Sequence, residues 1–134
     1  MITENEVNFG LVLHLDPDEL EANEATYTCA AEARVTGAHF FLCIGADDDC
    51  GRWLPLYSNA GIGRRELGPA GRSGHPKWTQ GKFHYHVGQL WTATHYAGSR
   101  AARAGGDLST PENRNRMTNE CADAVAASIA AYVD

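Results

Sequence analysis

Residues 38–58 read AHFFLCIGADDDCGRWLPLYS, and this stretch decides the fold that the sequence predicts. Its first part, residues 38–45, is apolar without interruption, which is typical of a strand buried on both faces. Residues 45–51 favour a turn, and residues 52–58 predict the returning strand. We expect the first strand at the centre of a sheet. Because Pro55 has no backbone N–H, we expect the second strand to lie at an edge or to carry a bulge.

Shorter strands are predicted on both sides of this hairpin. On the N-terminal side, residues 7–15 and 25–36 predict two strands, separated by an acidic loop or short helical turn. On the C-terminal side, a long connection rich in Gly and Pro, residues 59–81, includes one short strand at 64–67. Residues 82–87 and 88–96 then predict a second hairpin that turns at Gly88.

The C-terminal third predicts a linker followed by a helix. Residues 99–108 are small and polar, which favours the linker, and Ser109 with Glu112 forms a capping box around Pro111. A helix over about 110–133 follows, with an apolar stripe made of Met117, Cys121, Val125, Ile129 and Tyr132. The predicted fold class is therefore α+β. It is one domain, residues 1–134, in which a small, strongly bent antiparallel sheet or barrel (about 7–96) is closed off by a C-terminal helix.

Composition limits the class of protein. A chain of 134 residues with 43% hydrophobic and 21% charged residues fits one globular domain. No apolar run approaches the roughly 18 residues of a membrane helix, and the N-terminus does not resemble a signal peptide, so we expect a cytoplasmic protein without membrane contact. Four irregularly spaced cysteines favour reduced thiols, with a Cys43–Cys50 pair as the alternative. The sequence lacks nucleotide-binding glycine motifs, and no cofactor is expected.

Charge is distributed unevenly along the chain. The net charge is −6, but residues 1–51 hold eleven acids and one base, whereas residues 52–103 hold eight bases and one acid. A segment of net charge +7 favours an anionic partner. The alternative is that the acidic first third covers the basic middle and neutralises it within the fold.

Cationic and aromatic residues alternate in the basic segment. Nucleic-acid sites need cations for the phosphates and flat side chains on which unpaired bases stack. Trp78 lies in a predicted loop and is the candidate stacking platform. The predicted ligand-binding residues are Arg64, Arg65, Arg72, His75, Lys77, Trp78 and Lys82.

Histidines concentrate in the same region, because residues 72–95 contain four of the six in the chain. If residues 82–87 form a strand, His84 and His86 project from one face, about 7 Å apart along it. They could bind a metal ion with His75 or His95 as a third ligand, although the favoured interpretation is a site without metal. They could also act as general bases near the Ser58 hydroxyl, with Arg64 or Arg65 holding phosphate, as a metal-independent ribonuclease requires.

The order of these elements resembles the MazF/PemK-type toxin fold. In that family a glycine precedes the central apolar strand, and the next strand ends in proline, an aliphatic residue and a hydroxyl residue. Gly37 and residues 55–58 (PLYS) match this pattern. The resemblance implies a small barrel with a C-terminal helix and endoribonuclease activity. The family's Arg-Pro pair stands here as His39-Phe40, and its catalytic threonine as Tyr57.

Three functional hypotheses follow from these observations. The favoured one is a small protein that binds RNA or another polyanion through the basic, histidine-rich middle segment. The second is a toxin-type endoribonuclease that uses His84, His86 and Ser58. The third is a regulatory module without catalysis, which contacts a protein partner or a second copy of itself through its acidic third or its C-terminal helix.

Overall fold

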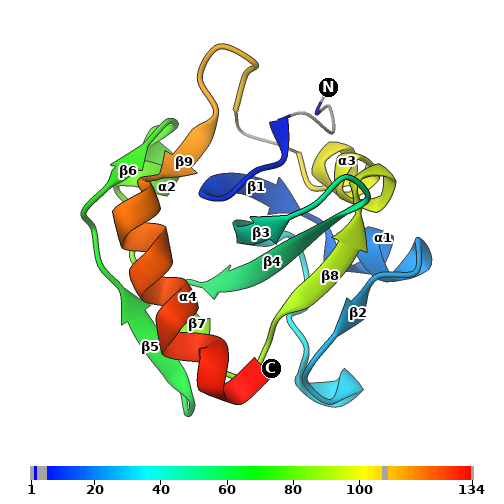
Figure 1. Cartoon of the computed structure of the whole chain (residues 1–134), viewed down its shortest axis with the longest axis horizontal. Helices are drawn as coiled ribbons and strands as arrows, with labels where there is room; N and C mark the ends of the chain where they lie inside the picture. Colours follow the sequence, from blue (N-terminus) through cyan, green and yellow to red (C-terminus); the bar gives the residue numbers. More distant parts are fainter. Residues whose placement is uncertain (1, 3–5, 107–108, 134) are drawn as a thin grey trace.

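The computed structural model describes residue 2 and residues 6–106 and 109–133, which form an α+β fold of nine strands and four helices (Figure 1). The strands are β1 (Leu11–Leu15), β2 (Thr26–Tyr27), β3 (His39–Ala46), β4 (Cys50–Tyr57), β5 (Arg64–Leu67), β6 (Arg72–Ser73), β7 (Phe83–His86), β8 (Trp91–Thr94) and β9 (Asn115–Met117). The helices are α1 (Pro17–Ala22), α2 (Pro76–Thr79), α3 (His95–Ala104) and α4 (Asn119–Val133), with a 3₁₀ turn at Ala31–Ala33.

The strands form one open antiparallel sheet. Seven of them follow the order β2-β8-β4-β3-β1-β9-β6, while β7 also pairs with β4 and carries β5 on its other side. The predicted α+β class with a C-terminal helix is confirmed. Of the two architectures expected, the bent sheet is present and the closed barrel is not.

The central hairpin forms as predicted, with β3 between β4 and β1. Side chains alternate across β3, so that Phe41 and Cys43 enter one core while Phe40 and Leu42 enter the other. This explains the unbroken apolar run, because both faces of the strand are buried. Both strands of the hairpin extend slightly beyond the apolar residues into the aspartate-rich turn.

Pro55 does not place β4 at an edge, and that prediction is wrong. β4 has β3 on one side, and on the other it pairs with β8 over Cys50–Trp53 and with β7 at Leu56 and Tyr57. Pro55 lies in the gap between these two partners, where a missing N–H breaks no ladder hydrogen bond. The register irregularity of the hairpin is in β3, between Cys43 and Gly45.

The predicted hairpin of residues 82–96 is also wrong. Both strands exist, but β7 and β8 pair with successive stretches of β4 and run in the same direction along it. They are two parts of one interrupted strand, separated by a turn in which the Gly88 N–H donates to His86 Nδ1 at 2.9 Å. Alternation alone could not distinguish this arrangement from a hairpin.

Helices cover both faces of the sheet (Figure 1). One core lies under α1 and α3 and includes Leu13, Phe41, Trp53 and Trp91; the other lies under α4 and includes Leu42, Leu56, Trp78 and Ile129. All three tryptophans are at most 1% exposed. The part of the basic segment from β5 to β7 is therefore attached to a well-packed scaffold on the α4 side.

The C-terminal third differs most from its prediction. Residues 99–104 of the expected linker belong to α3, whose Thr94 cap accepts the Ala97 N–H at 3.1 Å; residues 107–108 lie outside the described part. Alanine and arginine are strong helix formers, and this preference prevails over the small, polar appearance of the segment.

The predicted capping box does not begin a helix. Ser109 Oγ accepts a hydrogen bond from Arg114, β9 follows, and α4 begins only at Asn119. Within α4, Val125 and Ile129 of the predicted stripe are buried, whereas Tyr132 is 58% exposed. Met117 is buried too, but from β9.

The N-terminal third also differs in part. The predicted strand at 7–15 forms only over β1, and the strand at 25–36 is reduced to β2 and the 3₁₀ turn. All four cysteines are free thiols. Among the described residues, no helix has the length and hydropathy needed to cross a bilayer.

Candidate polyanion interface

An open groove lies where β3 begins, β4 ends and β7 begins. It is lined by Phe40, Ser58, Pro76, Lys77, Gln80, Gly81, Lys82 and Phe83. Phe40 and Phe83 are 7% and 8% exposed, so the groove has an apolar floor. Both lysines are exposed and, like Arg64 and Arg65 on the neighbouring β5, make no ion pair with any described residue.

Helix α2 positions Lys77 on this groove. Pro76 occupies the first turn, where no N–H is needed, and His75 caps the helix by accepting the Lys77 N–H on Nδ1 at 3.1 Å. The His75 N–H donates to the buried Asn115 side chain at 2.7 Å. His75 therefore holds the lysine in place, whereas the sequence predicted it as a ligand-binding residue.

Arg72, another predicted ligand-binding residue, is engaged within the fold. Its Nη1 donates to the carbonyls of Trp78 and Gly81, and its Nη2 to those of Leu67 and Gly68, at 2.6–3.1 Å. Burial lowers the pKa of this guanidinium from its ordinary value. Arg72 thus ties the groove's loops together, and its binding of an anion stays a prediction.

Trp78 cannot serve as the stacking platform, because its side chain is fully buried. Its ring packs against Phe83 at a centroid distance of 5.5 Å and against the Arg72 guanidinium at 4.8 Å. Its Nε1 donates to the Arg116 carbonyl at 3.1 Å. The sequence suggested an exposed loop here, but a helix of one turn directs the indole inward.

The two histidines of β7 share one face, as predicted. Phe83 and Tyr85 are buried, while His84 and His86 are partly exposed on the other side. His84 is in register with Tyr57 of β4 and with Glu66 of β5. His39 continues the row, with its ring centroid 5.7 Å from that of Tyr57. The row His39–Tyr57–His84–Glu66 therefore crosses four strands, although sequence spacing gave no sign of it.

The loop between β4 and β5 passes over this face. β4 and β5 pair with opposite edges of β7 and run parallel to each other, so the segment that connects them must cross β7. Gly63 packs directly on the His86 ring, because a Cβ atom added to Gly63 would lie 2.6 Å from His86 Nε2. His86 is therefore held between this loop and the Gly88 N–H, whereas the buried Nδ1 of His84 has no hydrogen-bond partner among the described residues.

The structure does not bring the predicted catalytic residues together. Ser58 lines the groove with Phe40 and Phe83, whereas His84 and His86 lie on the opposite face of the sheet. His95 begins α3 at the far end of β4, next to the Asp47 carbonyl at 2.7 Å. The His84–His86–His95 metal set therefore does not converge. No cluster of three His, Cys, Asp or Glu side chains suited to a metal exists among the described residues.

A buried polar network supports the edge of this face. Gln89, 1% exposed, donates from Nε2 to the Tyr57 hydroxyl at 2.7 Å and accepts at Oε1 from the Val35 N–H and from Trp91 Nε1. Burial raises the pKa of Tyr57, although Gln89 and the nearby Arg64 act in the opposite direction. The Arg64 guanidinium stacks 3.7 Å above the Tyr57 ring.

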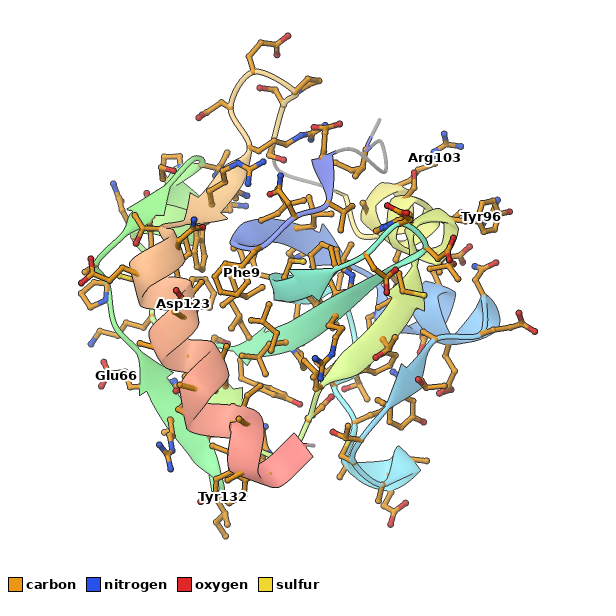
Figure 2. The ribbon with its side chains drawn as sticks, in the orientation of Figure 1. Phe9, Glu66, Tyr96, Arg103, Asp123 and Tyr132 are labelled. Atoms are coloured by element: carbon orange, nitrogen blue, oxygen red, sulfur yellow. The ribbon has the colours of Figure 1, made fainter. Side chains whose placement is uncertain are left out.

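The acidic third leaves most of the basic middle uncovered. Asp18 and Glu21 pair with Arg34 of their own third, and of the eight basic residues in 52–103 only Arg100, with Glu19 at 3.0 Å, makes an ion pair with a described residue. Figure 2 shows Glu66 of β5 and Arg103 of α3 on opposite sides of the molecule. The ion pair between the acidic third and the basic middle therefore lies where α1 meets α3, and the groove stays cationic.

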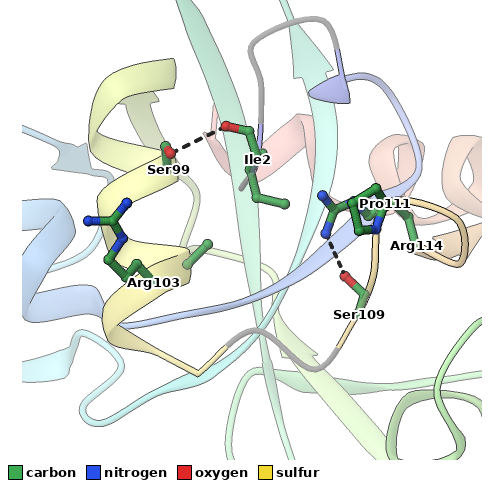
Figure 3. A pocket seen from close by; sticks show the side chains of 7 residues that line it. Ile2, Ser99, Arg103, Ser109, Pro111 and Arg114 are labelled. Atoms are coloured by element: carbon green, nitrogen blue, oxygen red, sulfur yellow. Dashed lines mark hydrogen bonds between the residues drawn. The ribbon is translucent and has the colours of Figure 1, made fainter.

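A second pocket, between α3 and the segment that precedes β9, contains two arginines (Figure 3). Its buried cation, Arg114, is bound by Glu6 at 2.7 Å and by Ser109 at 3.1 Å. The charge of Arg114 is thus already balanced by protein groups. This makes the pocket a weaker anion site than the groove.

Comparisons with protein families, curated proteins and solved structures find no match to this chain. The assignment of function therefore depends on the geometry of the groove and of the histidine face on the other side of the sheet.

Proposed function

We propose that this protein binds a polyanion, with single-stranded RNA as the representative ligand, across the groove of α2 and β7. The supporting observation is that Lys77 and Lys82 flank an open groove and make no ion pair with the described residues. Unpaired cations attract phosphates and release counterions when they bind them. Arg65, in register with Tyr85 and so on the Phe83 face of β7, extends the cationic surface, whereas Arg64 stacks on Tyr57 on the opposite face.

The recognition is mainly electrostatic. All three indoles are buried, and Phe40 and Phe83, which line the groove, are only 7% and 8% exposed. Base stacking on a tryptophan therefore does not contribute, and the groove distinguishes charge and backbone shape more than base identity. Binding is also expected to change tryptophan fluorescence little, so anisotropy of a labelled RNA is the suitable measurement.

The double variant Lys77→Ala/Lys82→Ala tests this proposal. Each phosphate contact with a single strand contributes about −0.7 to the slope of log K against log salt concentration. Loss of two contacts is therefore expected to weaken binding about 20-fold at 0.1 M salt. The matched control is Arg52→Ala/Arg103→Ala, which removes two exposed arginines outside the groove. We expect this control to bind within threefold of the wild type. Equal losses in both variants would contradict a specific groove.

RNA cleavage is a second candidate function, favoured by the row His39–Tyr57–His84–Glu66 on the face of the sheet opposite the groove. His84 is the candidate base, since its side chain is partly exposed on this face and lies in register with Tyr57 and Glu66. A base would take the proton of a 2′-hydroxyl, the freed oxygen would attack phosphorus, and an acid would protonate the departing 5′-oxygen, leaving a 2′,3′-cyclic phosphate.

For this second candidate, His84→Ala is expected to lower metal-free cleavage by 10²-fold or more, as typical of general acid–base catalysis, while RNA affinity stays within threefold. The measurement is product formation on gels with EDTA present. A substrate with a 2′-deoxy sugar at the cleaved position serves as the control and must remain intact. Cleavage that survives His84→Ala would exclude this histidine as the base.

A further inference from the structure

The β4–β5 loop carries an isoleucine whose side chain is completely exposed. Ile62 is 100% exposed, more than any other large hydrophobic residue in the described chain; Tyr96 and Tyr132 follow at 64% and 58%. The two tyrosines have hydroxyl groups that water or protein can bind, and the Tyr96 hydroxyl accepts a hydrogen bond from Arg100. The Ile62 side chain, in contrast, is entirely apolar.

This loop tip is braced on the sheet. The Arg64 N–H donates to the Gly61 carbonyl at 3.1 Å and closes a tight turn around Ile62, while Gly63 takes a positive φ of 76°. The Val87 N–H donates to the Gly63 carbonyl, also at 3.1 Å. The turn is thus fixed to the β7 end of the sheet, and its rigidity holds Ile62 away from the core.

Two arginines follow this apolar tip in the chain. Arg64, two residues after Ile62, stacks on Tyr57 with Nη1 donating to the Asn59 carbonyl at 3.0 Å, and Arg65 comes next, exposed. The loop leaves β4 at Ser58, which lines the groove. Three residues lie between Ser58 and Ile62, so the tip lies within about 14 Å of Ser58 at the end of the groove. A strand held by the groove lysines that passes around Ser58 to the histidine face can therefore reach the tip.

We propose that Ile62 is a wedge that inserts between two neighbouring bases of the bound RNA. This inference rests on the proposed function. Apolar side chains, isoleucine among them, are used by nucleic-acid-binding proteins to separate stacked bases, next to cations that hold the backbone. A lipid surface is the less suitable partner, because one isoleucine supplies too little apolar area to anchor a protein without a second membrane signal.

The test compares Ile62→Ala with Tyr96→Ala, which removes an exposed apolar side chain on α3. The probe is a single-stranded RNA that carries 2-aminopurine, whose fluorescence rises when it unstacks. We expect Ile62→Ala to bind about tenfold more weakly, since up to three buried carbon groups are lost, with an unchanged salt slope and no fluorescence rise. Tyr96→Ala is expected to match the wild type, and Ile62→Leu to keep most of the signal.

The outcomes separate this inference from the proposed function. If the wild type binds RNA through Lys77 and Lys82 but Ile62→Ala binds within twofold and gives the full fluorescence rise, the wedge is wrong and the groove stands. If the wild type binds no RNA at low salt, both are wrong. If Ile62→Ala loses binding only to phosphatidylserine vesicles, the tip is a membrane contact and the wedge is again excluded.

Discussion

Replacing Arg72 with methionine is expected to lower the free energy of unfolding by about 3 kcal/mol. The Arg72 guanidinium donates to four backbone carbonyls, of Leu67, Gly68, Trp78 and Gly81, and so joins both sides of the loop that carries Lys77 and Lys82. Methionine keeps part of the packing against Trp78 but leaves these carbonyls without their donors. The measurement is urea unfolding followed by circular dichroism.

Lysine at position 72 distinguishes the role of the charge from that of the hydrogen-bond geometry. An ammonium group has three donors and no planar fork, so Arg72→Lys is expected to recover less than half of the lost stability. Arg65→Met is the matched control, because the Arg65 side chain is exposed and makes no ion pair with a described residue. A loss below 0.5 kcal/mol for Arg72→Met, within the usual range for a surface substitution, would show that these bonds are dispensable.

Gln89→Leu is expected to lower the free energy of unfolding by about 2–4 kcal/mol, since two buried donors lose their acceptor. Those donors are the Val35 N–H and the Trp91 indole N–H, both bound to Gln89 Oε1 at 3.0 and 2.9 Å. Leucine has a similar size and adds apolar surface, so the loss isolates the polar network. Thermal unfolding of Gln89→Leu and Gln89→Glu measures it.

Gln89→Glu keeps the acceptor but removes the amide donor to the Tyr57 hydroxyl. It is therefore expected to lose less stability than Gln89→Leu near neutral pH if its carboxylate is satisfied by the two N–H groups and by Tyr57 as a donor. A Gln89→Leu protein as stable as the wild type would mean that Val35 and Trp91 find other acceptors.

The sequence predicts the centre of this fold better than its periphery. An uninterrupted apolar run has one simple explanation, a strand with both faces covered, and β3 is such a strand. Where the pattern allows two solutions, the tertiary structure decides. β7 and β8 alternate like a hairpin, yet they share β4 as their partner, and Pro55 marks the point at which β4 changes from one to the other.

The candidate site shows the same limit. Exposed Lys77 and Lys82 and the shared face of His84 and His86 follow from local patterns, and the structure contains both. The inward positions of Trp78 and Arg72 depend on a one-turn helix and on carbonyls from three separate segments, which local spacing does not encode. Gln89 and the row that begins at His39 also needed the strand register.

A salt titration of RNA binding tests the central claim most directly. Anisotropy of a labelled single-stranded RNA would be followed from 50 mM to 400 mM salt, with the wild type and Lys77→Ala/Lys82→Ala side by side. With three phosphate contacts, from Lys77, Lys82 and Arg65, the slope of log K against log salt concentration is expected to be about −2. In the double variant, the magnitude of this slope is expected to fall by about 1.4. Binding that is absent at 50 mM salt, or a slope that the double variant leaves unchanged, would contradict the account.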